Sequence, residues 1–137
     1  MSLLRQLSEQ VGYTIHTNRE LGLMLRGDKL LAVFADVEPF PDIVSRYLRL
    51  FDRHCAAGRL EKREYVDLGL GDRSVLTVMY ALPNESWRID AMIELRRQLA
   101  SWSPEAERME GSLLGYQDWQ NDIWLRDRFG QAPPAPD

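Results

Sequence analysis

The residues with the most distinctive chemistry lie close together near the C-terminus, between positions 116 and 125. Within ten residues this stretch holds two tryptophans, two aspartates and three side-chain amides. Tryptophan and tyrosine supply large contact areas, and carboxylates at the rim of such an area select basic partners. These residue types therefore indicate a surface that binds a protein. The residues predicted to form that surface are Glu110, Tyr116, Asp118, Trp119, Asn121, Asp122 and Trp124.

Three interpretations of this stretch compete. If it is helical, Trp119 and Ile123 share one face, while Asp118 and Asp122 stand one turn apart on another. The rings could be core contacts beside solvated aspartates, or part of the segment could be a docking surface. In the third interpretation, the two aspartates and Asn121 hold a divalent cation or act as acid and base. We predict a contact edge formed by the two aspartates and Asn121, which the tryptophans hold in place.

A competing class of function is a small enzyme or a small-molecule binder. Its site would be assembled from polar residues that are scattered along the chain, or from the four tryptophans gathered around a pocket with Tyr80. No stretch of the sequence carries a set of residues that commits to a reaction, so we favour a non-catalytic protein. The scattered polar candidates are His16, Tyr80, Arg88, Asp118 and Asp122.

The only cysteine, Cys55, follows His54, and this pair invites a nucleophile or metal interpretation. On a helix, however, neighbouring side chains project about 100° apart, and Cys55 falls on an apolar stripe where a buried thiol is expected. A closed zinc site needs four ligands, whereas the cysteine and the two histidines make three. We therefore expect no metal and no cofactor.

Composition indicates an ordinary globular chain. Of the 137 residues, 45% are apolar and 28% are charged, which is too apolar for general disorder. The longest apolar run, Leu30 to Ala35, is far shorter than the roughly 20 residues that cross a bilayer. The N-terminus lacks the continuous apolar core of a secretory signal, and a single cysteine fits a reducing compartment. We expect a cytoplasmic protein that does not enter membranes.

The net charge of −4 is concentrated at the C-terminal end. Residues 1–103 carry 14 basic and 14 acidic side chains, whereas residues 104–137 carry 3 and 7. An acidic end repels phosphate backbones, so nucleic acid is not expected as a partner. We predict a basic protein partner, and an inhibitor or immunity-type protein that neutralises a nuclease is one case. The sequence does not indicate the oligomeric state.

In the first half of the chain, apolar spacing predicts a short helix at 3–11 and then a β-hairpin. The strands of this hairpin are expected at 20–25 and 29–35, with the turn at Gly27-Asp28. Two prolines at 39 and 41 break the pattern. A helix with one apolar stripe follows at 41–57, and Gly58 is expected to end it.

In the second half, another β-hairpin is predicted at 61–68 and 74–82, because both runs are strand-like and a glycine-rich loop joins them. A helix is expected from about 86 to 99. Ser103-Pro104-Glu105 combines an N-cap hydroxyl with proline in the first turn, so another helix begins there and ends at Gly115. A last helix is expected at 117–128, followed by a proline-rich, disordered tail at 131–137.

These elements predict a single α+β domain over residues 1–130. Its two β-hairpins would form a four-stranded antiparallel sheet, packed by about five helices in a single layer. The order hairpin, proline, helix occurs twice, at about 20–57 and 61–100. An ancient duplication would explain this order, and so would the general frequency of Gly-Asp turns and of prolines before helices.

Overall fold

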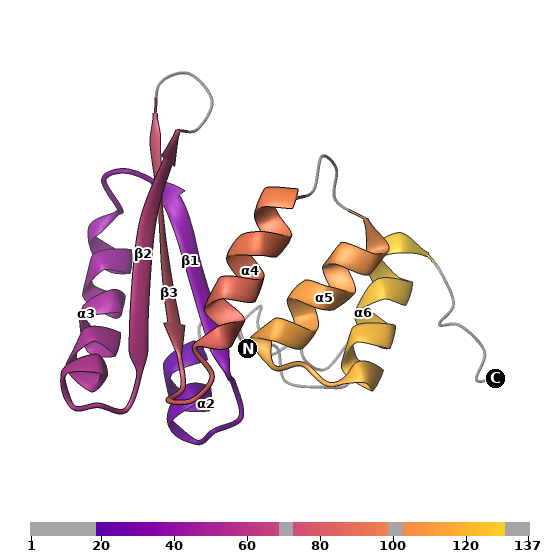
Figure 1. Cartoon of the computed structure of the whole chain (residues 1–137), viewed down its shortest axis with the longest axis horizontal. Coiled ribbons are helices and arrows are strands. Elements are labelled where there is room, and N and C mark those ends of the chain that lie inside the picture. Colours follow the sequence, from indigo (N-terminus) through magenta and orange to yellow (C-terminus); the bar gives the residue numbers. More distant parts are fainter. Residues whose placement is uncertain (1–18, 69–72, 99–102, 131–137) are drawn as a thin grey trace.

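The computed structural model describes residues 19–68, 73–98 and 103–130 of the chain, and Figure 1 shows its elements. The helix predicted at 3–11, His16, Trp102 and the tail at 131–137 lie outside these ranges. In chain order the elements are α2 (Glu20–Leu25), β1 (Leu31–Val37), α3 (Asp42–Ala56), β2 (Glu61–Leu68), β3 (Ser74–Ala81), α4 (Trp87–Gln98), α5 (Pro104–Leu114) and α6 (Asp118–Phe129).

The sheet has three strands in the order β1-β3-β2, and both neighbours of β3 are antiparallel to it. Ala81 of β3 lies opposite Leu31 of β1 on one side and opposite Glu61 of β2 on the other. The two outer strands are therefore parallel to each other, and α3 connects them (Figure 1). This is a β-α-β crossover with a third strand between its two strands.

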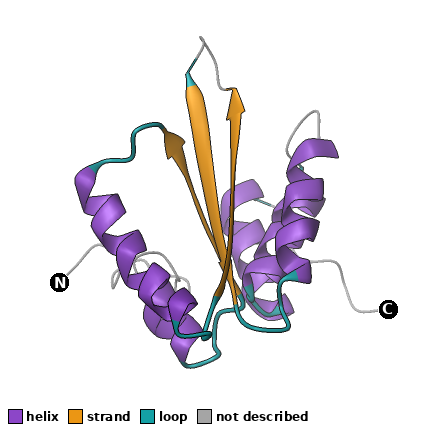
Figure 2. Ribbon diagram, turned by 60° about the vertical axis from the view of Figure 1, so that its left-hand side comes forward, coloured by secondary structure: helices purple, strands orange, loops and turns teal. Residues whose placement is uncertain are grey.

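Helices cover both faces of this sheet, as Figure 2 shows. Val78 and Tyr80 of β3 belong to the core on the α3 side, whereas Met79 and Ala81 belong to the core that α4 completes on the other side. All four are buried. The predicted single layer of helices is therefore wrong, because a central strand that is apolar on both faces needs cover on both.

The first predicted hairpin is also wrong, because residues 20–25 form the helix α2. The amide of Leu23 donates to the Arg19 carbonyl and that of Arg26 to the Gly22 carbonyl, which is the i to i−4 pattern of an α-helix. The segment is rich in leucine and methionine and has no β-branched residue, so its intrinsic preference is helical. With one strand fewer, the sheet has three strands instead of four, and the apparent repeat of hairpin and helix disappears.

The other elements predicted within the described ranges agree with the structure to within a few residues. The second hairpin forms as β2 and β3, and Gly58 follows α3 in the left-handed conformation with φ of 79°. In the described ranges no helix is long and apolar enough to cross a bilayer, and the longest, α3, has 15 residues.

The core between α3 and the sheet is aromatic. Phe51 of α3 stacks on Tyr80 with ring centroids 4.7 Å apart, and Phe34 meets both rings edge to face. The Tyr80 hydroxyl donates a hydrogen bond of 2.8 Å to Asp52, which also pairs with Lys62 at 2.9 Å. Burial, and then this carboxylate, raise the pKa of Tyr80. The phenol therefore stays protonated and acts as a donor at neutral pH.

Two glycines that end helices provide the first testable prediction. Gly115 and Gly130 both have positive φ, but only Gly115 is crowded: a Cβ there would lie 3.1 Å from the backbone nitrogen of Leu30. Gly130→Ala should cost about 1 kcal/mol of stability through φ alone, and Gly115→Ala about 2–3 kcal/mol. Urea unfolding measures both. Equal losses would contradict the close approach of the α5 end to Leu30.

Candidate functional site

The predicted contact residues lie on a helical hairpin formed by α5 and α6. The Ser103 hydroxyl accepts a hydrogen bond from the Ala106 amide at 3.1 Å and caps α5. Gly115, with φ of 104°, ends α5 and redirects the chain. At the start of α6, the Gln117 amide donates to the Gln120 side chain at 2.7 Å. Gly115 and the Gln117 cap therefore fix the two ends of the connection between α5 and α6.

Helix geometry separates the predicted residues on α6 into different faces. Trp119 and Ile123 are four residues apart and share the outward face, while Asp118 and Asp122 lie along one flank of it. Trp124 is about 140° around the axis from Trp119 and lies on the other flank. The side of α6 opposite the outward face carries the buried residues Asn121 and Leu125 and packs against α5. The residues singled out in the sequence therefore do not form one uniform surface.

Both tryptophans of α6 are on the surface. Trp119 is 48% exposed and Trp124 is 36% exposed. Each indole N–H donates a hydrogen bond, from Trp119 to Gln117 at 2.7 Å and from Trp124 to Glu107 at 2.8 Å. The interpretation of both rings as core contacts is contradicted by their exposure. The hydrogen bonds hold the rings in place while much of each ring stays accessible.

Asn121 does not belong to the contact edge predicted for it, because it is only 4% exposed. Its side chain points at α5, where its Nδ2 donates to the Ser112 hydroxyl at 3.2 Å. Gly111 lies so close that a Cβ in its place would be 2.1 Å from the Asn121 Oδ1. In this fold Asn121 is therefore part of the contact between α5 and α6, and a partner would not reach its side chain.

The carboxylates of Asp122 and Glu110 are both paired within the chain. Asp122 accepts a hydrogen bond from Arg108 of α5. Glu110 lies 3.5 Å from Arg96 of α4, and burial raises the pKa of its carboxyl although Arg96 acts in the opposite direction. Asp118 is different, because it is exposed and makes no ion pair or hydrogen bond through its carboxylate within the described chain. Asp118 is therefore the predicted acidic residue that is most available to a partner.

Tyr116 is half-buried between α5 and α6. The amine of Lys29 lies over its ring, 5.9 Å from the centroid. Lys29 is itself 3% exposed, and burial lowers its pKa to about 8 although Glu20 acts in the opposite direction. Tyr116 therefore contacts a buried cation that precedes β1, and it is a packing residue more than a contact residue.

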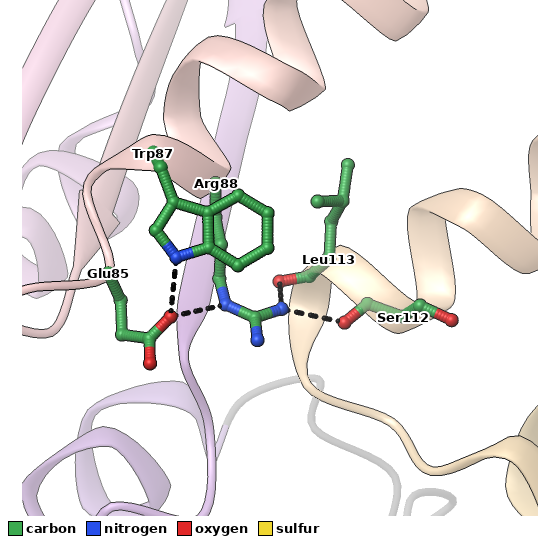
Figure 3. A network of polar contacts seen from close by, with 5 residues as sticks. All are labelled: Glu85, Trp87, Arg88, Ser112 and Leu113. Carbon is green, nitrogen blue, oxygen red and sulfur yellow. Dashed lines mark hydrogen bonds and ion pairs between the residues drawn. The ribbon is translucent and has the colours of Figure 1, made fainter.

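Arg88, a member of the alternative site, lies in a network that fastens α4 to the end of α5 (Figure 3). It donates to Glu85 at 2.7 Å and to the backbone carbonyls of Ser112 and Leu113 at 2.9 and 3.2 Å. The ring of Trp87 lies against its guanidinium, 4.6 Å from the centroid. These contacts join the start of α4 to the end of α5.

The structure does not bring the alternative site together. Tyr80 faces α3 on one side of the sheet, whereas Arg88, Asp118 and Asp122 belong to the helices on the other side. The described tryptophans are all exposed, so they do not line a pocket with Tyr80.

Outside α6, we considered a surface depression, metal-ligating groups and the cysteine among the described residues. A depression of about 390 Å³ at the end of the sheet is lined by Val37, Glu38, Arg73 and Ser74, none of which was predicted. No three of the described histidine, cysteine and acidic side chains are grouped so that they could hold a metal ion. Burial raises the pKa of the Cys55 thiol, which disfavours a nucleophilic thiolate.

Several exposed apolar side chains were not singled out in the sequence, and two of them, Met109 and Trp87, lie on α5 and α4. Met109 lies at helical spacing from Ala106 and Leu113, but it is 52% exposed while both of these residues are buried. Trp87 is 54% exposed at the start of α4. The spacing of Met109 fits the apolar stripe of α5, so no signal in the sequence distinguishes it from a core residue.

Comparison of this chain with protein-family models, with curated proteins and with solved structures finds no match.

Proposed function

We propose that this chain is a non-catalytic protein-binding module whose contact surface is the outward face of α6 together with its two flanks. We call this side the α6 surface, and its residues are Asp118, Trp119, Asp122, Ile123 and Trp124. The observation that carries the proposal is Trp119, a large aromatic side chain that is nearly half exposed and has its indole N–H bonded to Gln117. Tryptophan is among the residues most enriched at the energetic centres of protein interfaces.

The fixed orientation of the rings supports binding. A side chain that is ordered before association loses little entropy when the complex forms, and this lowers the free-energy cost of binding. Trp124 is restrained in the same way by Glu107, which also approaches Arg128 at 3.7 Å. A partner that offers an apolar pocket would therefore meet aromatic groups that already have defined positions.

We propose a basic protein as the partner. Asp118 supports this choice, because its exposed carboxylate stands one residue from Trp119 and is not neutralised by a described side chain. Asp122 is half-exposed and paired with Arg108, so it contributes less. The excess of acidic residues in 104–137 also attracts a basic partner, and it does so over a longer range. An inhibitor or immunity-type protein that neutralises a nuclease is one case of this function.

The test is crosslinking in cells with a photoreactive amino acid placed at Asp118, and at Arg97 of α4 as a control on another helix. The expected result is one predominant conjugate at position 118 with a protein of isoelectric point above about 8, and none at position 97. Trp119→Ala should remove this conjugate, whereas Met109→Ala, which removes an equally exposed apolar side chain from α5, should leave it. The same conjugates at both positions, or an acidic partner, would overturn the proposal.

The stability of the variants separates lost contact from lost folding. Because Trp119 is largely exposed, Trp119→Ala should lower the free energy of unfolding by only about 1 kcal/mol, far less than the 3–5 kcal/mol expected for a core tryptophan. Urea denaturation measures this value. A loss in the core range would mean that the ring packs inside the fold, and the α6 surface would then lose its central residue.

A further inference from the structure

The outward side of α3 combines exposed aliphatic side chains with arginines. Ile43, Arg46, Leu50 and Arg53 follow one another at spacings of three and four residues, so they form one stripe along the helix, and Arg49 adjoins it. Ile43 is 78% exposed and Leu50 is 41% exposed, and the three arginines are also exposed. We call these five residues the α3 stripe. The opposite side of α3 carries Leu48 and Phe51, which are buried against the sheet.

The arginines of the α3 stripe lack the ion pairs that the arginines of α5 and α6 have. On the other side of the sheet, the three arginines of α5 and α6 each lie within 4 Å of a carboxylate, as Arg108 does with Asp122. None of the three stripe arginines makes an ion pair or hydrogen bond through its side chain within the described chain. Three guanidinium groups therefore point into solvent from adjacent turns of one helix.

The acidic residues of α3 do not neutralise this charge. Asp52 already accepts from Tyr80 and from Lys62 at 2.8 and 2.9 Å, on the side that faces β2. Asp42 lies in the first turn, where a carboxylate stabilises the positive end of the helix dipole. The α3 stripe is thus a local concentration of positive charge on a chain whose net charge is −4.

We propose that the α3 stripe docks an acidic, partly apolar segment of a protein partner. Guanidinium groups form bidentate hydrogen bonds with carboxylates, so Arg46, Arg49 and Arg53 fit a row of aspartate or glutamate side chains. Ile43 and Leu50 lie beside that row and would be covered by apolar side chains of the same segment. The charge complementarity selects the partner, and the aliphatic contacts add affinity.

Neither a membrane nor a nucleic acid fits this surface as well. A helix that lies in a bilayer needs a broad apolar face toward the lipid, and the broad apolar face of α3 is occupied by the sheet. A phosphate backbone carries no apolar side chains, so it would leave Ile43 and Leu50 uncovered. Carboxylates on a short segment of protein match both the size of the stripe and its mixed character.

The α3 stripe is independent of the α6 surface, because α3 and α6 lie on opposite sides of the sheet (Figure 1). A chain with both surfaces could bring an acidic partner and a basic partner together. The crosslinking at Asp118 does not involve α3, and the experiment that follows does not involve α6. Failure of one proposal therefore leaves the other intact.

The experiment uses the full chain and a fluorescent 15-residue helical peptide in which glutamates at i and i+4 flank leucines. A second peptide carries lysine in place of each glutamate. Fluorescence anisotropy should show saturable binding of the acidic peptide, at least about tenfold tighter than binding of the basic one. Binding should also weaken several-fold between 50 and 500 mM NaCl, because salt screens exposed charge pairs.

Matched charge reversals then locate the contact. Arg46→Glu and Arg97→Glu change the net charge equally, but Arg97 lies on α4. Arg46→Glu should weaken binding of the acidic peptide at least about tenfold, and Arg97→Glu less than twofold. Ile43→Ser should weaken binding several-fold, whereas Met109→Ser on α5 should not change it.

Several outcomes would overturn the proposal. The acidic peptide could fail to saturate at 500 µM, the two peptides could bind equally, or the two charge reversals could have equal effects. Tighter binding to phosphatidylglycerol vesicles or to a 20-base-pair DNA duplex, lost in Arg46→Glu, would assign the stripe to lipid or to nucleic acid instead.

Discussion

Replacing Gly111 with alanine is expected to lower the free energy of unfolding by about 1–3 kcal/mol. The added Cβ would lie 2.1 Å from the Oδ1 and 3.0 Å from the Cγ of Asn121. Asn121 is buried and bonded to Ser112, so it could move aside only by losing that bond or by separating α5 from α6. Urea unfolding followed by circular dichroism measures the loss.

A second glycine provides the matched control. Gly22 also lies inside a helix, α2, but a Cβ there would meet no atom within 4 Å. Gly22→Ala should therefore raise stability by about 0.5–1 kcal/mol, because alanine loses less backbone entropy on folding. In the double variant Gly111→Ala with Asn121→Ala, the clash disappears and the two losses should not add. Losses that add fully would show that the two residues do not meet as described.

The second large effect concerns Lys29. The free energy of unfolding of the parent chain should rise with pH, and Lys29→Met should remove this rise. Burial lowers the pKa of Lys29 to about 8 in the folded chain, against 10.5 as its ordinary value. Between these values the unfolded chain binds more protons than the folded one, so the free energy of unfolding rises with pH. The full rise is about 3 kcal/mol. Below pH 7 both states are protonated and this contribution is absent.

The measurement is urea unfolding at intervals from pH 7 to 10. Above this window Tyr47, whose pKa burial raises to about 12, lowers stability again as pH increases. Lys29→Met should be more stable than the parent at pH 7 and should show a flat profile. Lys62→Met, which removes a more exposed lysine, should retain the rise. A rise of equal size in Lys29→Met would show that another group causes it.

Local signals predicted the helical hairpin of α5 and α6 well. Ser103 and Pro104 begin α5, and Gly115 ends it with φ of 104°, each for a reason that is contained in a few neighbouring residues. Residues 20–25 were mispredicted as a strand, because alternating leucines in six residues fit both periods. The burial of Met24 depends on packing against α3 and the sheet, which no local pattern contains.

The candidate site could be predicted in part. Residue types and charge pointed to the region of α6, but not to the orientation of its side chains. Asn121 was predicted to be a surface residue because asparagine is polar. Gly111, a glycine inside a predicted helix, indicated that another group packs closely against that position. The ion pairs that neutralise Asp122 and Glu110 join residues 14 positions apart, so they became visible only in the fold. The sequence shows the arginines of the α3 stripe beside an apolar helix face. It does not show that these arginines have no ion-pair partner, which depends on the fold.

The position of β3 between β1 and β2 has a consequence for synthesis on the ribosome. β3 is the last strand to be made, yet both other strands pair only with it. When residues up to the end of β2 have emerged, β1 and β2 are parallel strands without a shared ladder, and α3 has no completed sheet to cover. The sheet can therefore assemble only after residue 81 leaves the exit tunnel, so a nascent chain that pauses before this point exposes apolar strands to chaperones or to other chains.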